Sequence, residues 1–586
     1  MCGIFALLGA GVESEVGDFT NGTDRGPEGS RQTIVVRVKD QLGAVGGIKL
    51  GFHLLSINGY RKKGSCQPIE VDGIHIVCNG EIYNWRKLYA TLGITESRTE
   101  SDSEVIIHLY KRFGIGYTLQ ALDGVFAFVL VDTNKHVAYA ARDAYGVRPL
   151  FWSTQEGVPL SQLGIRRSVL FASELKMLVS SKVREHPFVV ATRKDPKQFP
   201  PGSYVEIKPD GEYGGSPLWS YVEVSEPVVF SRICGTLLDL WGQNARFRFY
   251  PSVDSHMFAL GLIRGSLQDA VYKRVANTDR PIACLLSGGL DSSLIAALVS
   301  QRATRPISTW SIGLKGSVDL QYANIVADHI GSDHHSIEVE EDEFLAAIRP
   351  VIRAIESYDT TTVRASVGNW LVAKYIRENS DAKVIFNGDG ADEVCGGYLY
   401  FHCAPNALAF DYECRRLLGE IHYFDVLRSD RSVSAHGLEA RTPFLDRLFV
   451  QAYMSIPVNL RYHVGRGEPE KGLLRSAFSG TGLLPESVIW RTKEAFSDGV
   501  SKETRSWFSI IQDYARTVAE PLSCEGTEST GLDYEKALYK RIFLEYYPQS
   551  CDVIPHLWMP RFIDAEDASA RTLAVYKRVH ESVASC

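Results

Sequence analysis

The second residue of this 586-residue chain carries a group that could do covalent chemistry. Cys2 lies between the initiator Met1 and Gly3. Removal of Met1 would leave a thiol and a free α-amine on one residue, and that amine could take the proton that the thiol loses when it attacks a carbonyl. The start of the chain therefore predicts an N-terminal nucleophile for acyl transfer. A buried, inert cysteine that opens a strand is the alternative.

A second candidate site is the run of small residues from 287 to 293, Ser-Gly-Gly-Leu-Asp-Ser-Ser. Small residues let backbone N–H groups converge on an anion, and a helix that follows adds its positive N-terminal dipole. The chain contains no Gly-Lys dipeptide, so this is not a Walker A loop. We therefore predict a site for a pyrophosphate that leaves during adenylation, with a ligand-free turn as the alternative.

A third cluster, Asn387 to Glu393, closes another apolar run and contains Asp389 and Asp392. Open parallel sheets bind ligands at the carboxyl ends of their strands, and carboxylates there can hold Mg²⁺ on phosphate oxygens. A solvated turn has the same composition. Arginines beside hydroxyls or acids at 360–364 and 438–446 suit a small carboxylate substrate, although structural ion pairs would have the same sequence.

The elements that must position these residues change in character along the chain. In the first 205 residues, short β-type runs separated by glycine predict strands at 3–8, 33–38, 74–78, 125–131 and 136–141. Helical patterns cover 85–92 and 103–112. We therefore expect antiparallel sheets covered by helices, followed by a connector around residues 200–250.

From residue 280 onward, apolar strands alternate with helical stretches. The predicted strands are 282–286, 309–314 and 384–387, and the predicted helices are 292–299, 319–329 and 366–376. Alternation of this kind predicts a parallel α/β sheet.

Composition narrows the possible partners. The net charge is -7, with 45% hydrophobic and 23% charged residues, so no basic face for nucleic acid and no membrane span are expected. The 11 cysteines include no Cys-x-x-Cys pair, and the apolar start lacks a basic segment. We expect a cytoplasmic protein that acts on small molecules.

Taken together, the motifs resemble those of the glutamine-hydrolysing asparagine synthetases, which carry a class II glutamine amidotransferase domain. The matching stretches of the first half are Cys2-Gly3-Ile4, Arg25-Gly26-Pro27, 79–84, Asp102 with Glu104, and 143–150. Those of the second half are 287–293, 361–366, 438–446, 491–499 and 569–573.

The resemblance implies two domains of different fold. Residues 2–205 would form an α+β, Ntn-hydrolase-like sandwich, which is the glutaminase. Residues 206–255 would connect it to an α/β, ATP pyrophosphatase-like domain at 256–586 that ends in a C-terminal tail. Homodimers are usual in this family.

For the first domain, the resemblance implies a thioester between Cys2 and the side-chain amide carbon of glutamine. Asn79 and the Gly80 N–H would form the oxyanion hole. Position 54, Glu81 and Asp102 would bind glutamine, and ammonia would be released.

For the second domain, the resemblance implies that ATP adenylates aspartate and that ammonia, carried through an internal tunnel, displaces AMP from β-aspartyl-AMP. Expected ATP contacts are Leu286, Ser287, Gly288, Gly289, Asp291, Ser292, Ile312, Asn387 and Gly388. Mg²⁺ would bridge to Asp291 and Asp392, and Lys471 would stabilise charge. Thr361, Thr362, Arg364 and Arg441 would orient aspartate.

Several positions depart from the family pattern. Leu54 stands where an arginine clamps the α-carboxylate of glutamine, so we expect weaker glutamine use unless Arg61, Lys62 or Lys63 replaces it. In the third cluster the usual Ser-Gly-Glu-Gly-Ser becomes Asn387-Gly-Asp389-Gly-Ala391, and Asp389 replaces a glutamate assigned to the ammonia step. Glu28 replaces an aspartate. The two acid-for-acid changes, at Asp389 and Glu28, predict altered reaction rates.

Two other functions stay open from the sequence. A related amidotransferase could act on a different carboxylate, although the Thr361-Thr362-Val363-Arg364 run favours aspartate. Alternatively, the protein could have lost catalysis and serve as a binding or assembly partner. The retained phosphate loop, Asp392 and Lys471 argue against that loss.

Overall fold

The computed structural model of the chain divides into two compact units. It describes residues 1–10, 18–39, 45–59, 66–157, 166–179, 191–193, 196–213, 216–219, 222–231, 253–502, 504–518, 529–548 and 550–576. The first unit comprises Met1–Arg232, Ser434–Gly437 and Tyr546–Val553. The second comprises Ile233–Val433, Leu438–Glu545 and Ile554–Cys586.

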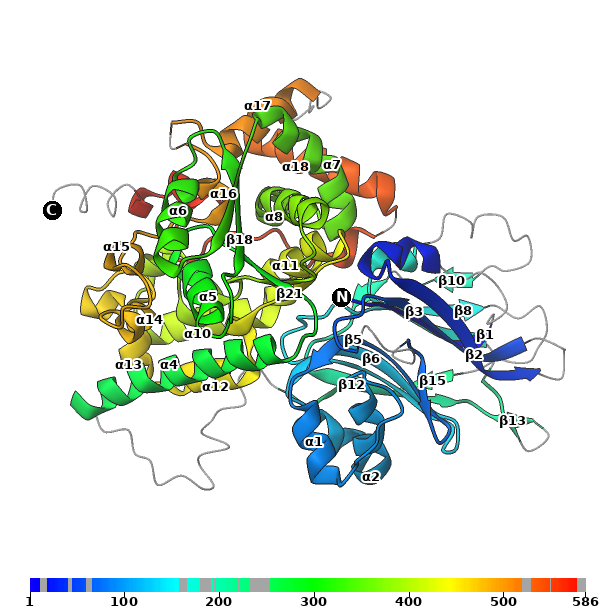
Figure 1. Ribbon diagram of the computed structural model, residues 1–586. Helices are drawn as coiled ribbons and strands as arrows, with labels where there is room; N and C mark the ends of the chain where they lie inside the picture. The colour runs from blue at the N-terminus through cyan, green and yellow to red at the C-terminus, as the bar shows by residue number, and fades with distance from the viewer. Residues whose placement is uncertain are drawn as a thin grey trace. The chain divides into compact units, whose positions relative to one another are not determined.

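The first unit is a sandwich of two antiparallel sheets (Figure 1). The first sheet has the order β10-β8-β9-β1-β3-β2, and β11 also pairs with β8. Its strands are β1 (Gly3–Ala10), β2 (Gly29–Lys39), β3 (Val45–Leu54), β8 (Phe151–Gly157), β9 (Arg166–Ala172), β10 (Ala191–Arg193) and β11 (Lys197–Gln198).

The second sheet has the order β15-β12-β7-β6-β5-β4, and β16 also pairs with β12. Its strands are β4 (Ile69–Val71), β5 (Ile74–Ile82), β6 (Gly124–Asp132), β7 (Val137–Arg142), β12 (Ser203–Pro209), β15 (Val222–Val224) and β16 (Val228–Val229). A separate hairpin joins β13 (Glu212–Tyr213) to β14 (Ser216–Pro217).

Alternating side chains on β5 supply both faces of the second sheet. Val77 is buried between the two sheets, together with Ile4 and Leu8 of β1. Ile76 faces the other way and packs with Val105 of helix α2 (Glu104–Ala121). Helices α1 (Trp85–Leu92) and α2 thus cover the outer face, as Figure 1 shows, and the predicted sandwich is confirmed.

The first unit extends beyond the boundary that we predicted at residue 205. That boundary falls inside β12, whose residues Tyr204 to Ile207 pair with β7. The segment that we assigned to a connector therefore supplies β12, β15 and β16 to the second sheet, because their backbone groups complete its ladder. Residues 232–252 of the predicted connector lie outside the described residues.

The second unit contains a five-stranded parallel sheet with the order β19-β18-β17-β20-β21. Its strands are β17 (Ile282–Leu285), β18 (Ser308–Leu314), β19 (Asp333–Val339), β20 (Val384–Phe386) and β21 (Glu439–Arg441). Helices α5 (Leu290–Ser300), α6 (Val318–Ile330) and α8 (Thr360–Asn379) lie between them in the chain. The predicted alternation of strand and helix is confirmed.

The remaining elements complete the two units. The other α-helices are α4 (Val253–Ala276), α7 (Glu341–Ile355), α9 (Ala391–Cys395), α10 (Ala407–Glu420), α11 (Asp425–Ser434), α12 (Arg447–Ser455), α13 (Val458–Arg461), α14 (Gly472–Phe478), α15 (Glu486–Ile489), α16 (Phe496–Gly499), α17 (Trp507–Val518) and α18 (Gly531–Tyr546). The described 3-10 helices are η1 (Phe19–Arg25), η2 (Leu175–Met177), η4 (Leu399–Cys403), η5 (Ile421–Tyr423), η6 (Pro443–Leu445), η7 (Val464–Arg466), η8 (Cys551–Val553) and η9 (Ala570–Thr572). Within the described ranges, no helix combines the length and the apolar character needed to cross a bilayer.

The register of the parallel sheet brings two of the predicted motifs together. Cys284 of β17 pairs with Phe386 of β20, so the loops that follow these neighbouring strands leave the same edge of the sheet. Gly388 makes their close approach possible, because a β carbon there would lie 2.7 Å from the backbone nitrogen of Ser292. The carboxyl edge of the sheet is therefore where a site can form.

Candidate active sites

In the first unit, Cys2 lies directly before β1, at the end of the sandwich core. Its Sγ is 3.5 Å from the carbonyl oxygen of Leu55, and its own carbonyl accepts a hydrogen bond of 3.2 Å from Arg25 Nε. The residue is partly exposed, whereas Ile4, two positions later, is fully buried. A thiol in this position is accessible to a small molecule.

Asn79 and Gly80 lie side by side on β5. The Asn79 side chain is fully buried, yet neither its amide nitrogen nor its amide oxygen has a hydrogen-bond partner. A β carbon at Gly80 would lie 2.3 Å from the carbonyl oxygen of Val125 on β6, so only glycine fits there. A buried amide without hydrogen-bond partners is costly, so we expect a ligand to form hydrogen bonds with the Asn79 side chain.

The other predicted residues of this site are also buried. Glu81 Oε2 accepts a hydrogen bond of 2.9 Å from Asn58 Nδ2, and Asp102 Oδ2 accepts one of 2.6 Å from the backbone N–H of Ile82. Burial raises the pKa of the Cys78 thiol well above its ordinary value, and negative charge on Asp102, Cys2 and Glu81 adds to that shift. Asp102, Cys2 and Glu81 therefore each lie near the Cys78 side chain.

Leu54 ends β3 and presents no charge to this site. It is partly buried against the sandwich core, and its carbonyl accepts a hydrogen bond of 3.0 Å from the N–H of Glu28. The Glu28 carboxylate in turn accepts one of 2.8 Å from the Ser56 N–H, which gives that acid a structural contact. The predicted substitutes Arg61, Lys62 and Lys63 lie outside the described residues.

One described cation shares a sheet face with Leu54. In the β2–β3 ladder, Gly29 is opposite Leu54 and Arg31 is opposite Phe52, so Arg31 is a diagonal neighbour of Leu54. Arg31 is exposed. The sequence analysis did not identify this residue, because only the strand register shows which side chains share a face.

In the second unit, a pocket opens at the carboxyl edge of the parallel sheet. Most of the predicted nucleotide and metal residues line it, namely Leu286, Ser287, Gly289, Asp291, Ser292, Ile312, Asn387, Gly388 and Asp392. Asp389, Lys471, Thr361 and Thr362 also line it. Gly288 does not, but its left-handed φ of +71° and its packing against the backbone of Ala323 set the path of the loop.

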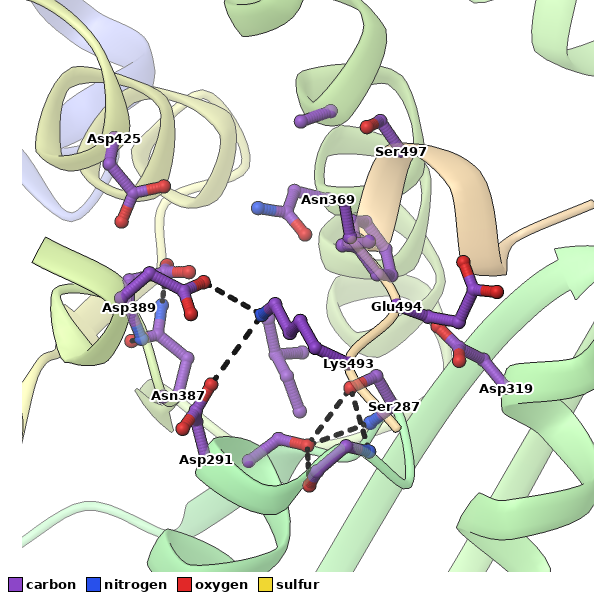
Figure 2. A pocket seen from close by; sticks show the side chains of 18 of the residues that line it. Ser287, Asp291, Asp319, Asn369, Asn387, Asp389, Asp425, Lys493, Glu494 and Ser497 are labelled. Atoms are coloured by element: carbon purple, nitrogen blue, oxygen red, sulfur yellow. Dashed lines mark hydrogen bonds and ion pairs between the residues drawn. The ribbon is translucent and has the colours of Figure 1, made fainter. Parts of the chain in front are cut away.

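The Ser287 loop leads into the N-terminus of α5. Ser292 Oγ accepts a hydrogen bond of 3.1 Å from the Ser287 N–H, and the two hydroxyl oxygens are 3.0 Å apart. No side chain caps α5, so its first backbone N–H groups remain available to an anion, as does the positive end of its dipole. Figure 2 shows Ser287 at this end of the pocket.

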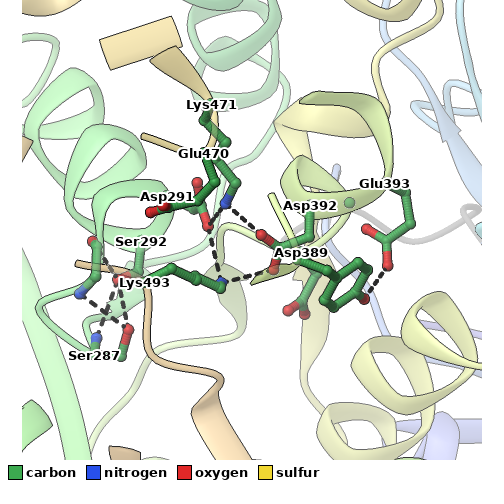
Figure 3. Close-up of polar contacts among 12 residues, drawn as sticks. Ser287, Asp291, Ser292, Asp389, Asp392, Glu393, Glu470, Lys471 and Lys493 are labelled. Carbon is green, nitrogen blue, oxygen red and sulfur yellow. Dashed lines mark hydrogen bonds and ion pairs between the residues drawn. The ribbon is translucent and has the colours of Figure 1, made fainter. Parts of the chain in front are cut away.

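Two lysines and two aspartates form a charge network across the pocket (Figure 3). Lys471 Nζ is 2.5 Å from Asp291 Oδ2 and 2.5 Å from Asp392 Oδ1. Lys493 Nζ is 2.7 Å from Asp392 Oδ2 and 3.7 Å from Asp291 Oδ2. The network joins the first turns of α5 and α9 to the start of α14 and to the segment before α16.

The network fixes the charge state of its members. Burial by itself would raise the pKa of Asp392, but the two ammonium groups outweigh it and hold that pKa well below its usual range. Burial would likewise lower the pKa of Lys471, and the carboxylates of Asp291 and Asp392 raise it above its usual range instead. Asp392 and Lys471 are therefore both charged at neutral pH.

The residues present fit a magnesium ion that is shared with a nucleotide. Asp291 Oδ1 is buried and lacks a hydrogen-bond partner, and Asp392 lies on the other side of the same lysine. Mg²⁺ takes one or two carboxylates together with phosphate oxygens and water. Within the described residues no group of three or more His, Cys, Asp or Glu side chains is placed to hold a metal ion.

Asp389 lies on the other side of the pocket beside Asn387 (Figure 2). Its two carboxylate oxygens accept hydrogen bonds of 2.7 Å from Asn387 Nδ2 and 3.0 Å from Arg428 Nη2. Burial raises the pKa of Asp389 above its usual value, although the Arg428 guanidinium opposes the shift. The acid is thus held in one orientation and faces the pocket.

The two predicted threonines differ in what their hydroxyls contact. Thr362 Oγ1 donates a hydrogen bond of 2.7 Å to Asp359, the residue that caps α8. Thr361 Oγ1 is buried, lines the pocket and has no hydrogen-bond partner. Of this pair, Thr361 has the hydroxyl that a ligand can use.

The two predicted arginines do not line this pocket. Arg364 is buried and forms ion pairs of 2.6 Å with Glu535 and with Asp567. Arg441 is also buried, and its guanidinium contacts Glu439 at 2.7 Å and the carbonyl of Arg274 at 2.9 Å. Both guanidiniums hold distant segments together, which is the structural alternative noted from the sequence.

The pocket is also lined by residues that were not assigned from the sequence, among them Lys493, Arg428 and Asp425. Lys493 belongs to the 491–499 motif, so the motif could have indicated it. Arg428 reaches Asp389 across 39 residues of chain, and Asp425 accepts a hydrogen bond of 3.2 Å through Oδ2 from the Gly390 N–H. No local sequence pattern predicts contacts of that range.

Comparisons with known proteins match both units. The family model described as "Asparagine synthase" matches residues 262–412 and 404–561, and the one described as "Glutamine amidotransferase domain" matches residues 1–207. The chain is 39% identical to the asparagine synthetase (glutamine-hydrolyzing) of Gallus gallus over 595 residues, or 98% of this chain and 99% of that protein. The proteins of the same name from Bos taurus and Homo sapiens are 38% identical over 595 and 599 residues, with the same 98% and 99% coverage.

Replacing Arg364 should affect folding stability strongly. Arg364→Ala would leave the buried carboxylates of Glu535 and Asp567 without their shared cation, which should cost about 3 to 5 kcal/mol in the free energy of unfolding. Arg505→Ala is the matched control, because Arg505 forms an exposed ion pair with Glu341 and should cost at most about 1 kcal/mol. Urea unfolding measures both, and equal stabilities of the two variants would contradict the structural role of Arg364.

Proposed function

Because this chain belongs to the family of glutamine-hydrolysing asparagine synthetases, we propose that it makes asparagine from aspartate in two half-reactions. Enzymes of this family are carbon–nitrogen ligases that combine a glutamine amidotransferase with an ATP-using synthetase. The first half-reaction releases ammonia from glutamine in the first unit. The second activates aspartate with ATP in the second unit and joins it to the ammonia.

In the first unit, Cys2 attacks the side-chain amide carbon of glutamine. Removal of Met1 frees the α-amine, which accepts the thiol proton and returns it to the departing ammonia. The partnerless, buried amide of Asn79 and the N–H of Gly80 stabilise the oxyanion that forms on the carbonyl oxygen. Water then hydrolyses the thioester and gives glutamate. Glu81 and Asp102 bind the amino group of glutamine, because both are buried acids near Cys78, the residue before Asn79 on β5.

In the second unit, the β-carboxylate of aspartate attacks the α-phosphorus of ATP. A new O–P bond forms, the bond to the β-phosphate breaks, and pyrophosphate leaves from the loop of Ser287 and the N-terminus of α5. Leu286 and Ile312 line the pocket where the adenosine binds. Lys471 and Lys493 neutralise the charge that develops on the phosphates.

Ammonia then attacks the activated carbonyl carbon of β-aspartyl-AMP. A carbon–nitrogen bond forms, the carbon–oxygen bond to AMP breaks, and the Asp389 carboxylate accepts the proton that the attacking nitrogen loses. Thr361 Oγ1 orients aspartate, and Arg428 lies close enough to assist with its carboxylate. Arg364 and Arg441 take no direct part.

Asp291 and Asp392 would hold Mg²⁺ together with the phosphates of ATP, and the ion would neutralise phosphate charge and orient the nucleotide.

One observation carries the proposal. The phosphate loop, both metal-type carboxylates, Lys471 and the acid Asp389 line a single pocket with their charges paired, as an adenylating site requires. A catalytically reduced homologue that acts as a binding or assembly partner would have no need of this arrangement. Likewise, an available Thr361 hydroxyl favours a small acid such as aspartate over a different carboxylate.

We also propose that the protein forms a homodimer and that it is cytoplasmic. The described cysteines form no disulfides, which is typical of a reducing compartment.

The test is product analysis with aspartate, ATP and Mg²⁺, supplied with either glutamine or ammonium. With either donor, we expect AMP, pyrophosphate and asparagine to form in equimolar amounts. Cys2→Ala should abolish the reaction with glutamine and leave the reaction with ammonium within about twofold, because the second pocket uses no thiol. Mass measurement of the N-terminus checks Met1 removal.

Two results would count against the proposal. Absence of pyrophosphate with either donor would favour the non-catalytic alternative. If Cys2→Ala lost the glutamine-dependent and the ammonium-dependent activity equally, the result would contradict a specific role of Cys2 in the glutamine half-reaction.

Leu54 should make glutamine a poor donor. Leu54→Arg should raise kcat/KM for glutamine by at least about tenfold, because a hydrogen-bonded ion pair to the α-carboxylate contributes about 1.5 to 3 kcal/mol. Steady-state kinetics with glutamine measures the gain, and kinetics with ammonium should not change.

Leu54→Met is the matched control, since it adds length without charge. If Leu54→Arg and Leu54→Met gave the same kcat/KM for glutamine, the carboxylate would already have another partner. Arg31 would then be the first residue to replace, because it shares the sheet face with Leu54.

A further inference from the structure

The carboxylate of Asp389 is held from two sides. Asn387 Nδ2 donates to Oδ2 at 2.7 Å, and Arg428 Nη2 donates to Oδ1 at 3.0 Å. Arg428 is itself fixed by a second contact to Asp425 on the same face of α11. With a donor on each oxygen, the carboxyl group cannot rotate freely, so its position depends on both donors.

Asn387 is itself fixed by three further contacts. Its Nδ2 also donates a hydrogen bond of 2.7 Å to Ser429 Oγ on α11, and its Oδ1 is 3.4 Å from the Asp389 N–H. Its backbone N–H donates to the Arg441 carbonyl on β21 at 3.1 Å. An amide nitrogen has two hydrogens, and both are used here. Asn387 therefore ties the reactive acid to the sheet and to α11.

The lengths of the two side chains complement each other. Asp389 is one methylene shorter than the glutamate of the family pattern, so its oxygens lie closer to the backbone. The Asn387 amide reaches one bond further than the serine hydroxyl of that pattern. A serine at 387 would end before the 2.7 Å contact that Asn387 makes, and a glutamate at 389 would crowd the amide.

We propose that Asn387 is a positioning residue for Asp389 and that the two residues form a matched pair. Asn387 places the shortened acid where the nitrogen nucleophile loses its proton. The pair thereby replaces the serine and glutamate of the family pattern as a unit. This inference rests on the proposed function, because it concerns the acid that serves the ammonia step.

A double-mutant cycle tests the pairing. Asn387→Ser removes a hydrogen bond to a charged group and should lower kcat with ammonium about tenfold or more. Asp389→Glu misplaces the carboxylate by about 1 Å and should lower it by about 10- to 100-fold. The double variant should recover to within about tenfold of the wild-type rate, because the losses of coupled residues do not multiply.

The readout separates positioning from a general structural effect. The single variants should lower asparagine formed per AMP by a larger factor than they lower the release of pyrophosphate from ATP and aspartate. Asn387→Asp keeps the volume of the side chain but removes the donor, and it should lower the same ratio even if Asn387→Ser is unstable. Asn406→Ser is the matched control: Asn406 caps α10 outside the pocket, serine caps equally well, and kinetics should not change.

Losses that multiply in the double variant would overturn the pairing, as would an unchanged asparagine-to-AMP ratio in both Asn387 variants. Since the wild-type enzyme is assayed for pyrophosphate and asparagine in the same experiments, either result beside an active wild type would leave the proposed function standing. Recovery in the double variant supports the pairing.

Discussion

The second unit depends on a network of opposite charges that no single segment could support. Asp291, Asp392, Lys471 and Lys493 come from four places in the chain, and each buried charge would be costly alone. Together they neutralise one another and hold the loops after two neighbouring strands at a fixed separation. The backbone allows the Lys471 side chain to reach both aspartates, because Lys471 adopts a left-handed φ of 58° and Gly397 leaves room for that side chain. The same charges suit a nucleotide and its metal ion, so the constraint on folding is also the basis for binding.

Much of this architecture can be predicted from the sequence. Short β-type runs separated by glycine in the first 205 residues and alternating strands and helices after residue 280 correspond to local rules, and the sandwich and the parallel sheet were both confirmed. The Ser287 loop and the Asn387 cluster could be placed in one pocket, because parallel strands present their carboxyl ends at the same edge. The helix at Trp85–Leu92 has the predicted bounds, since its apolar face is continuous over two turns.

Other features depend on contacts between distant segments and could not be predicted. Arg364 was expected to bind substrate, but it forms ion pairs with Glu535 and Asp567, which lie 171 and 203 residues further along the chain. No sequence pattern near Arg364 predicts these ion pairs. The strands from 203 to 229 are short, and glycines and prolines interrupt the segment, so their place in the second sheet becomes visible only from their pairing. Arg428 was missed for the same reason, because its contact with Asp389 spans 39 residues of chain.

The central claim is that the second pocket activates the acid with the nucleotide, and isotope transfer tests it most directly. Aspartate labelled with ¹⁸O in its side-chain carboxylate is converted with ATP and ammonium, and the phosphate-containing products are analysed by mass. The account predicts one labelled oxygen in AMP and none in pyrophosphate, because the carboxylate oxygen that attacks the α-phosphorus leaves with it. AMP that forms without label, or label that appears in pyrophosphate or inorganic phosphate, would contradict it.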